Sequence, residues 1–205
     1  MAINQRTVTI YGRLSYAHLN TPHAPNDQAE PKYSATLLID KTNTDAINTV
    51  NQAITAAVDD GVTRRVFNQP IDPTHTKYPP LRDGDTPNDS GEPRGQEFAG
   101  HYFIAAKNKK QPIVVNAQRQ PIIDPDEVYS GCYVNMAIEF YGYSTSGNKG
   151  IAANLIGVQK VKDGERLGVE PPKAEDVFGV VNGNNATGND SPWSTPGADT
   201  QNLGF

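Results

Sequence analysis

The sequence predicts a mainly β protein, a small barrel of about five strands with one helix and long loops, followed by a disordered C-terminal tail. Several runs alternate apolar and polar residues with the period of a strand, and one run repeats apolar residues with the period of a helix. After residue 178 the chain consists mostly of Gly, Asn, Ser, Thr, Pro and Asp. The 18 glycines and 16 prolines account for long loops between the elements.

The region from Tyr129 to Gly168 predicts the longest strands, paired as a hairpin. Two strand-like runs are separated by residues 146–150, where glycine and asparagine favour a turn. In the first run, one face is apolar and suits the core, whereas the other carries three tyrosines that either a ligand or a neighbouring segment can cover. The apolar face comprises Val134, Met136, Ile138 and Phe140, and the second face comprises Tyr133, Asn135, Glu139, Tyr141 and Tyr143.

Two strands and a helix precede this hairpin. Residues 7–19 and 32–40 read as strands, and we expect a bulge at Gly12. In the first strand we expect one face to hold Val8, Ile10, Leu14 and Tyr16, and the other to hold Tyr11 and Arg13. Residues 43–60 predict an amphipathic helix, capped at its start by Asn43 or Thr44 and ended by Gly61.

The middle of the chain is the least regular part. Residues 61–100 predict a long loop, which is either functional or disordered. A short strand follows at 101–106, and residues 112–115 can continue it before a turn at 121–128. This order of elements favours a barrel of the OB type, with a β-sandwich as the competing fold. We expect one OB-fold domain over residues 1–178 and a flexible acidic tail over 179–205.

Charge is unevenly distributed along the chain. The net charge is −5. Residues 1–166 hold 17 basic and 18 acidic residues, and residues 167–205 hold one basic and five acidic residues, so the body is near −1 and the tail near −4. A near-neutral body can still carry a basic stripe on one face, because charges are screened beyond about 10 Å at 0.1 M salt. We find no membrane-spanning run and no signal peptide, and expect an intracellular protein.

Catalytic motifs are weak. Asp83, Asp85 and Asp124 could hold a metal in a nuclease, but they stand among turn-forming residues, where aspartate is expected for local hydrogen bonding. The four histidines lack a metal-binding spacing and read as surface or loop residues, and no phosphate-binding glycine loop is present. Cys132 is the only cysteine and reads as a buried thiol. We therefore expect no catalytic residue, metal or cofactor.

Aromatic residues interleaved with basic residues are the remaining signal. Single-stranded nucleic acid requires this combination, because bases stack on aromatic rings while lysine and arginine neutralise the backbone. Six short segments, in order and at similar spacing, resemble a family of bacteriophage and prophage single-stranded DNA-binding proteins. They are Arg13–Tyr16, Pro31–Ser34, Pro80–Asp85, Gly100–Phe103, Val128–Tyr133 and Gly147–Ile151.

The resemblance covers about residues 6–178 and implies an OB-fold without catalysis that coats single strands during phage replication and recombination, in the cytoplasm of the infected bacterial host. Phage and bacterial single-strand binders also have acidic tails that end in an aromatic residue, so Phe205 is a candidate contact for replication proteins of phage or host. The tip here departs from that pattern, because Asp199 is the only acidic residue among the last ten. A tail of charge −4 can also compete with DNA for a basic groove.

The candidate DNA-binding residues follow from the pairing of rings with cations. We expect stacking on Tyr16, Tyr33, Tyr78, Tyr102, Tyr133, Tyr141 and Tyr143. We expect phosphate neutralisation by Arg13, Lys32, Arg82, Lys107, Lys109, Lys110 and Lys149. Duplex DNA is a further candidate partner. A phage metal-dependent nuclease and a virion or scaffold interaction module are the alternative functions.

Overall fold

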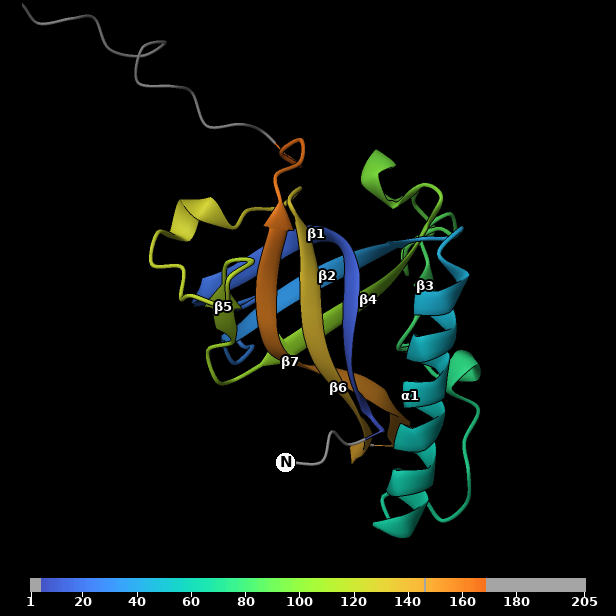
Figure 1. The fold of residues 1–205 in the computed structure, drawn as a ribbon. Helices are drawn as coiled ribbons and strands as arrows, with labels where there is room; N and C mark the ends of the chain where they lie inside the picture. The colour runs from blue at the N-terminus through green and yellow to red at the C-terminus, as the bar shows by residue number, and fades with distance from the viewer. Residues whose placement is uncertain (1–4, 146, 169–205) are drawn as a thin grey trace, which may run out of the picture. The chain divides into compact units, whose positions relative to one another are not determined.

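The computed structural model describes residues 5–145 and 147–168 (Figure 1). Within these residues, seven strands form one sheet beside one α-helix, α1 (Thr44–Thr63). The strands are β1 (Thr7–His23), β2 (Lys32–Asp40), β3 (Arg82–Asp83), β4 (His101–Asn108), β5 (Ile113–Val115), β6 (Tyr133–Thr145) and β7 (Asn148–Lys162). Short 3-10 helices occupy Pro73–His75, Gln96–Phe98 and Pro125–Glu127.

The sheet closes into a barrel of five strands, β1, β2, β4, β7 and β6. Neighbouring strands pair antiparallel except β4 and β7, whose short parallel ladder joins Ala106 to Ala153 and closes the ring. β3 and β5 lie outside the ring, on β4 and β7 respectively. The OB-type barrel is therefore confirmed, and the alternative of a sandwich is excluded because one continuous sheet surrounds one core.

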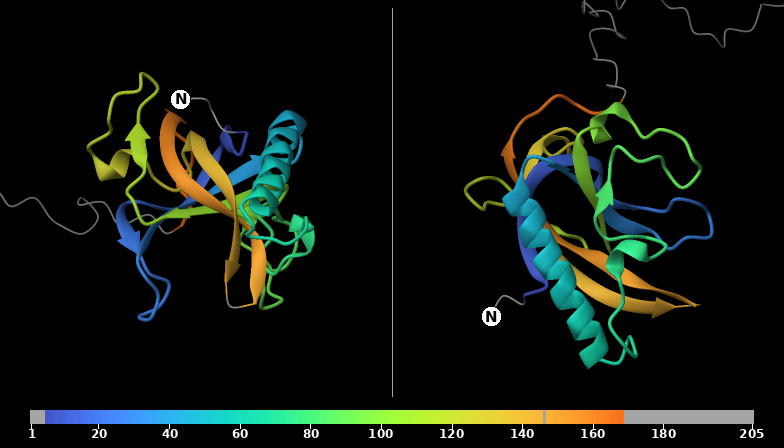
Figure 2. Two further views of the ribbon diagram at one scale, coloured as in Figure 1. Left: turned by 90° about the horizontal axis from the view of Figure 1, so that it is seen from below. Right: turned by 90° about the vertical axis from the view of Figure 1, so that its right-hand side faces the viewer.

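The predicted hairpin is confirmed as the β6–β7 pair, whose register runs from Tyr133 opposite Lys162 to Thr145 opposite Asn148. The four apolar side chains of β6, from Val134 to Phe140, are fully buried, as their alternation predicts. Figure 2 shows the tip of this hairpin and the β1–β2 connection projecting to the same side of the barrel. Residues of the hairpin line one of the two clefts described below, and residues of the β1–β2 connection line the other.

β1 differs from its prediction at two positions. Tyr16 does not join the core face, because it has a positive φ of 46° at a register shift between Ser15 and His18, and its side chain is 59% exposed. Gly12 is not a bulge, since it pairs regularly with Val134. It is needed for close packing instead, because a side chain there would clash with the carbonyl oxygen of Leu38 on β2.

Helix α1 begins where the sequence indicates and ends later. The Asn43 side chain accepts a hydrogen bond from the Ala46 N–H, as a capping residue should. Gly61 lies inside the helix rather than ending it, because a side chain there would meet the ring of Phe67, which is buried between α1 and β6. α1 packs mainly against β6 and β1, and its buried face joins the barrel core.

The irregular segment 61–100 is tied to the barrel at β3, which pairs Arg82 with Phe103 of β4. Lys41 also holds this region, because its ammonium group contacts Asp83 at 2.5 Å and Asp85 at 2.6 Å. These two hydrogen bonds raise the pKa of Lys41. The sequence allows residues 112–115 to continue β4. Residues 113–115 instead form β5, which pairs in parallel with β7.

The predicted tail over 179–205, the domain boundary at 178 and Phe205 lie outside the described residues. No helix in the described part of the chain is both long and apolar enough to cross a membrane.

Candidate nucleic-acid interface

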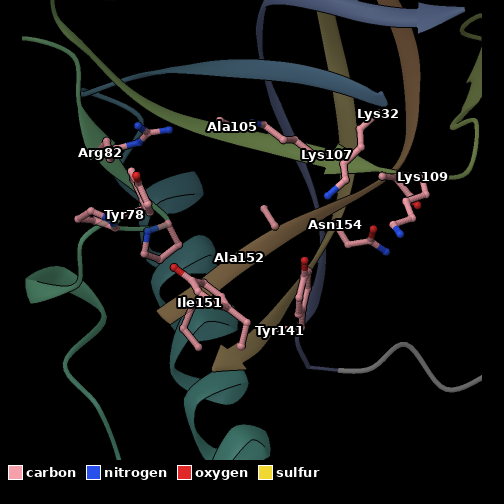
Figure 3. A pocket seen from close by; sticks show the side chains of 15 residues that line it. Lys32, Tyr78, Arg82, Ala105, Lys107, Lys109, Tyr141, Ile151, Ala152 and Asn154 are labelled. Carbon is pink, nitrogen blue, oxygen red and sulfur yellow. The ribbon is translucent and has the colours of Figure 1, made fainter. Parts of the chain in front are cut away.

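A cleft of about 610 Å³, called the main cleft below, lies between β4, the half of the β6–β7 hairpin nearer its turn and the segment 78–82. Figure 3 shows Tyr78 and Arg82 at one side of this cleft and Lys107, Lys109 and Asn154 at the other. The side chains between them are small, with Ala105 on β4 and Ala152 on β7. The cleft thus results from two alanines on neighbouring strands that leave room between larger side chains.

The main cleft is strongly basic although the chain is acidic overall. Four basic residues and no acidic residue line it, and the basic ones are Lys32, Arg82, Lys107 and Lys109. Among the described residues, no carboxylate forms an ion pair with Lys32, Arg82 or Lys107. Lys109 contacts Glu30 at 2.8 Å, and this hydrogen bond lowers the pKa of Glu30. Three cations are therefore available to an anionic ligand.

Three tyrosines supply aromatic surface to the same cleft. Tyr78 is 46% exposed and Tyr141 is 42% exposed, so both rings can receive a flat ligand. Tyr143 lies opposite Gly150 in the hairpin, and a side chain at Gly150 would clash with the Tyr143 ring. Glycine at this position therefore lets Tyr143 lie against the neighbouring strand.

A second cleft of about 460 Å³, the side cleft, shares Lys32, Ala105 and Lys107 with the main cleft. It extends toward β1 and the β1–β2 connection, where Tyr16 lines it. His18 and His23 also line it, and their rings stack with centroids 4.4 Å apart and planes inclined by 12°. Burial lowers the pKa of His18, and the neighbouring His23 lowers it further. The shared residues make the two clefts one continuous path across β2 and β4.

A different group of aromatic and basic residues occupies the other end of the hairpin, and we call it the tyrosine face. The Tyr133 ring stacks on Tyr11 at 6.0 Å, and Lys162 lies 4.5 Å from its centroid. Lys160 and Arg166 both lie over the ring of Tyr129. The tyrosine face comprises Tyr11, Tyr129, Tyr133, Lys160, Lys162 and Arg166.

Eight of the fourteen residues predicted to bind DNA line the two clefts: Tyr16, Lys32, Tyr78, Arg82, Lys107, Lys109, Tyr141 and Tyr143. The other six do not. Lys110 and Lys149 are exposed near the ends of β4 and β7, and Tyr133 belongs to the tyrosine face. Arg13 donates hydrogen bonds to the carbonyls of Gly131 (3.2 Å) and Glu165 (2.7 Å), which is a structural use of its charge.

Tyr33 and Tyr102 also lie away from the clefts. By strand alternation Tyr33 is on the same side of β2 as the buried Ala35, and Tyr102 is on the same side of β4 as the buried Ile104. The Lys41 ammonium group lies 5.1 Å from the Tyr102 ring centroid. Both tyrosines therefore belong to the inward-facing rows of their strands, and their predicted contact with DNA stays a prediction.

The cleft residues His18, His23 and Asn154 were not singled out from the sequence, and neither was Arg94, which lies over the same ring as Arg82. Arg94 lies in a polar run that reads as loop, and only the fold brings it near Phe103, with its guanidinium carbon 4.8 Å from the ring centroid. The two histidines are five residues apart in a bulged strand, so a simple alternation did not predict their stacking.

The carboxylates considered for a nuclease have other partners. Asp83 and Asp85 hold Lys41, and Asp124 accepts a hydrogen bond from the Asp126 N–H at the start of a 3-10 helix. Over residues 5–145 and 147–168, no group of three histidine, cysteine, aspartate or glutamate side chains is placed to hold a metal ion. The buried thiol of Cys132 is confirmed, and burial raises its pKa.

Comparison with known proteins identifies the family. Residues 5–190 match the sequence model of a protein family, and that family is described as "Enterobacter phage Enc34, ssDNA-binding protein". The chain therefore belongs to this family of phage proteins, which confirms the resemblance noted in the sequence. Protein p50 of Acyrthosiphon pisum secondary endosymbiont phage 1 is 34% identical over 160 residues, which cover 75% of this chain and 81% of that protein.

Solved structures agree with this assignment. The single-stranded DNA-binding protein of bacteriophage Enc34, in complex with single-stranded DNA, is 30% identical, with a TM-score of 0.64 over 79% of this chain and 88% of that chain. The single-stranded DNA-binding protein encoded by bacteriophage T7 has a TM-score of 0.56 over 82% of this chain and 98% of that chain. At 14% identity, the latter likeness concerns the fold alone.

Proposed function

We propose that this protein binds single-stranded DNA along the path formed by the main and side clefts. The observation that carries the proposal is the set of unpaired cations, Lys32, Arg82 and Lys107, beside exposed tyrosines in one groove. Membership of a family described by single-stranded DNA binding supports the same ligand. A concentration of several such cations in one groove, with no acidic residue lining it, favours an anionic ligand.

The two kinds of residue have separate roles. Lys32 and Lys107 stand where the clefts meet, so they would neutralise phosphates near the middle of the path. Tyr78 and Tyr141 in the main cleft, and Tyr16 in the side cleft, would each stack on a base. Neither contact depends on base identity, so the protein would coat DNA of any sequence.

The biological role follows from this mode of binding and from the phage family. The protein would cover single strands exposed during phage DNA replication and recombination in the cytoplasm of the infected host, without a catalytic step of its own. Duplex DNA, and replication proteins that contact the tail through Phe205, are further proposed partners. The acidic tail would compete with DNA for the basic clefts.

The test compares two pairs of charges. Fluorescence anisotropy of a labelled oligo-dT, titrated across salt, would be measured for the unaltered protein, for Lys32→Gln/Lys107→Gln and for Lys162→Gln/Arg166→Gln on the tyrosine face. Both double variants lose two positive charges. We expect the cleft variant to bind about tenfold or more weakly at 0.1 M salt, and its salt dependence to fall by about 1.4 in log–log slope, or 0.7 for each lost phosphate contact. The tyrosine-face variant should bind as the unaltered protein does.

Three outcomes would count against the proposal or part of it. Equal losses in both double variants would mean that net charge, not the cleft, attracts DNA. No binding by the unaltered protein at low salt would reject the nucleic-acid function and make the exposed tyrosines a protein-contact surface. The same anisotropy measurement would be made with a matching DNA duplex and with a chain that ends at Phe178. If the shortened chain bound oligo-dT at low salt with unchanged affinity, competition by the tail would be rejected.

A further inference from the structure

Two arginines from different segments contact one phenylalanine ring beside the main cleft. Arg82 comes from β3 and Arg94 from the loop 84–98, and their guanidinium carbons lie 4.6 and 4.8 Å from the ring centroid of Phe103. Phe103 is only 3% exposed, and the ring of Phe98 packs against it edge-on at 5.0 Å. The ring is thus a fixed platform that holds two positive charges close together.

Neither positive charge is compensated. Among the described residues no carboxylate forms an ion pair with Arg82 or Arg94. Arg94 donates hydrogen bonds to the carbonyls of Thr86 at 3.0 Å and Pro87 at 3.2 Å. Arg82 Nε is buried and has no hydrogen-bond partner. A buried donor on a charged group without a partner is costly, so the guanidinium group of Arg82 would gain from an added anion beside it.

The electrostatics of Arg82 agree with this geometry. Burial lowers its pKa, the charge of Arg94 lowers it further, and the more distant Asp89 opposes these effects. An anion placed between the two guanidinium groups would relieve both their mutual repulsion and the loss of solvent. Arg82 also lines the main cleft, so such an anion would be part of the path described above.

We propose that Arg82 and Arg94, held by Phe103, form a seat for a single phosphate group that both arginines share. Guanidinium groups bind phosphate through paired N–H donors, which suits a bridging anion better than two separate contacts do. The charge of Arg94 acts on Arg82, and in the proposed seat one phosphate contacts both groups. This inference rests on the proposed DNA-binding function for the source of the phosphate, a phosphodiester of the strand, and a free phosphate is the other source of the same chemistry.

The number of phosphates is measurable. Oligo-dT binding across salt would be compared for Arg82→Gln, Arg94→Gln, the double variant and Arg119→Gln, a control on an exposed loop residue for which no side-chain contact is found. We expect each single variant to weaken binding about tenfold, because a hydrogen bond to a charged group is lost. The double variant should lower the log–log salt slope by about 0.7, the value for one phosphate on a single strand.

Other slopes would overturn the inference. A fall of about 1.4 in the double variant would mean that each arginine holds its own phosphate. A slope equal to that of Arg119→Gln would mean that neither arginine contacts the strand. If Arg82→Gln does not fold, Arg94→Gln still decides, because its hydrogen bonds lie within its own loop. Weaker binding with an unchanged slope would fit a shared phosphate, a slope lower by about 0.7 would mean a phosphate of its own, and unchanged affinity would mean no contact with the strand.

A second measurement tests the seat without DNA. Thermal unfolding would be followed with inorganic phosphate replacing chloride at constant ionic strength. Phosphate should raise the melting temperature of the unaltered protein and of Arg119→Gln by more than that of the double variant, because its exclusion from protein surfaces stabilises all three to a common extent. Equal shifts in all three would overturn the seat. If the unaltered protein bound no oligo-dT, the DNA-binding proposal would fail. The thermal unfolding measurement would still show whether the two arginines bind phosphate. A phosphate-dependent shift without a change in salt slope would reject the strand as the source of the phosphate.

Discussion

The two ends of the β6–β7 hairpin carry similar residue types, tyrosine with basic residues. They differ in how many of the basic side chains already have a ring or carboxylate partner. Toward the turn of the hairpin, the main cleft combines Tyr141 with cations such as Lys107 that have no carboxylate partner among the described residues. At the other end, the tyrosine face combines Tyr133 with Lys162, but there the cation already lies on the ring. Lys160 is likewise occupied, since it contacts Asp163 at 2.8 Å.

This difference separates a binding surface from a structural one. On the tyrosine face, cation–π contacts fix the segment 163–167 against the barrel, and Tyr129 adds a hydrogen bond to Asp163. In the clefts the occupation is partial, because Lys77 lies 5.3 Å from the ring centroid of Tyr78 and Lys109 contacts Glu30, whereas Lys32 and Lys107 have neither a ring nor a carboxylate partner among the described residues. Tyrosine and lysine together do not distinguish the two surfaces, whereas the number of cations without an internal partner in one groove does. The predictions below test this distinction.

The largest expected contrast is between tyrosines at the two ends. Tyr78→Ala and Tyr141→Ala should each weaken oligo-dT binding by about 1 to 3 kcal/mol, because each removes a ring on which a base stacks. Tyr133→Ala should leave the affinity unchanged and lower the stability instead, since Tyr11 and Lys162 lose the ring they contact. Anisotropy and urea unfolding of the three variants would provide both measurements.

Phenylalanine substitutions serve as controls for this contrast. Tyr78→Phe and Tyr141→Phe keep the ring and should retain most of the affinity, because stacking needs the ring rather than the hydroxyl group. If Tyr133→Ala weakened DNA binding as much as Tyr141→Ala did, while remaining folded, the tyrosine face would be a DNA surface and the comparison would fail.

Arg13 provides an intermediate test, because the sequence placed it among phosphate contacts and the structure gives it backbone partners. Arg13→Gln should lower the free energy of unfolding by about 1 to 2 kcal/mol, since its two hydrogen bonds from a charged group to the carbonyls of Gly131 and Glu165 are lost and one of them is exposed. DNA affinity should stay the same. Urea unfolding beside the control Arg119→Gln would measure the first effect. If Arg13→Gln kept its stability but bound DNA more weakly, Arg13 would be a DNA contact.

The sequence predicts the barrel well because most of it depends on local alternation and punctuation. β2 has the expected bounds, and the apolar face of β6 is the buried one. The failures occur where distant contacts decide. Gly61 looks like a helix end, but it is retained inside α1 for the ring of Phe67. Residues 113–115 look like a continuation of β4, but they pair with a strand more than forty positions later.

The site is predicted less completely, for a related reason. Residue type shows that Lys32, Lys107 and Tyr141 can bind DNA, and they do line the clefts. The same criterion also selects Arg13 and Tyr133, because the sequence does not show which cations already have partners. Arg94 was missed altogether, since the loop that carries it reaches Phe103 only in the folded protein.

The smallest expected effect concerns His18 in the side cleft. Its pKa is lowered in the folded protein, so the neutral form is favoured there, whereas an unfolded histidine titrates near about 6.5. His18 therefore contributes stability above that pH, and this contribution declines as the pH falls through about 6.5 toward the folded pKa. A phosphate in the side cleft would favour the protonated form. DNA binding should then strengthen as the pH falls, by less than about tenfold between pH 7.5 and 6.

His18→Gln should remove part of both pH dependences. At constant ionic strength, the variant should lose less stability than the unaltered protein between pH 7.5 and 6, and gain less affinity for oligo-dT. Stability measures the group in the free protein, and affinity measures whether DNA reaches it. A variant that matches the unaltered protein in affinity but not in stability would confine the strand to the main cleft. The side cleft would then resemble the tyrosine face, as a set of aromatic groups that serve the fold.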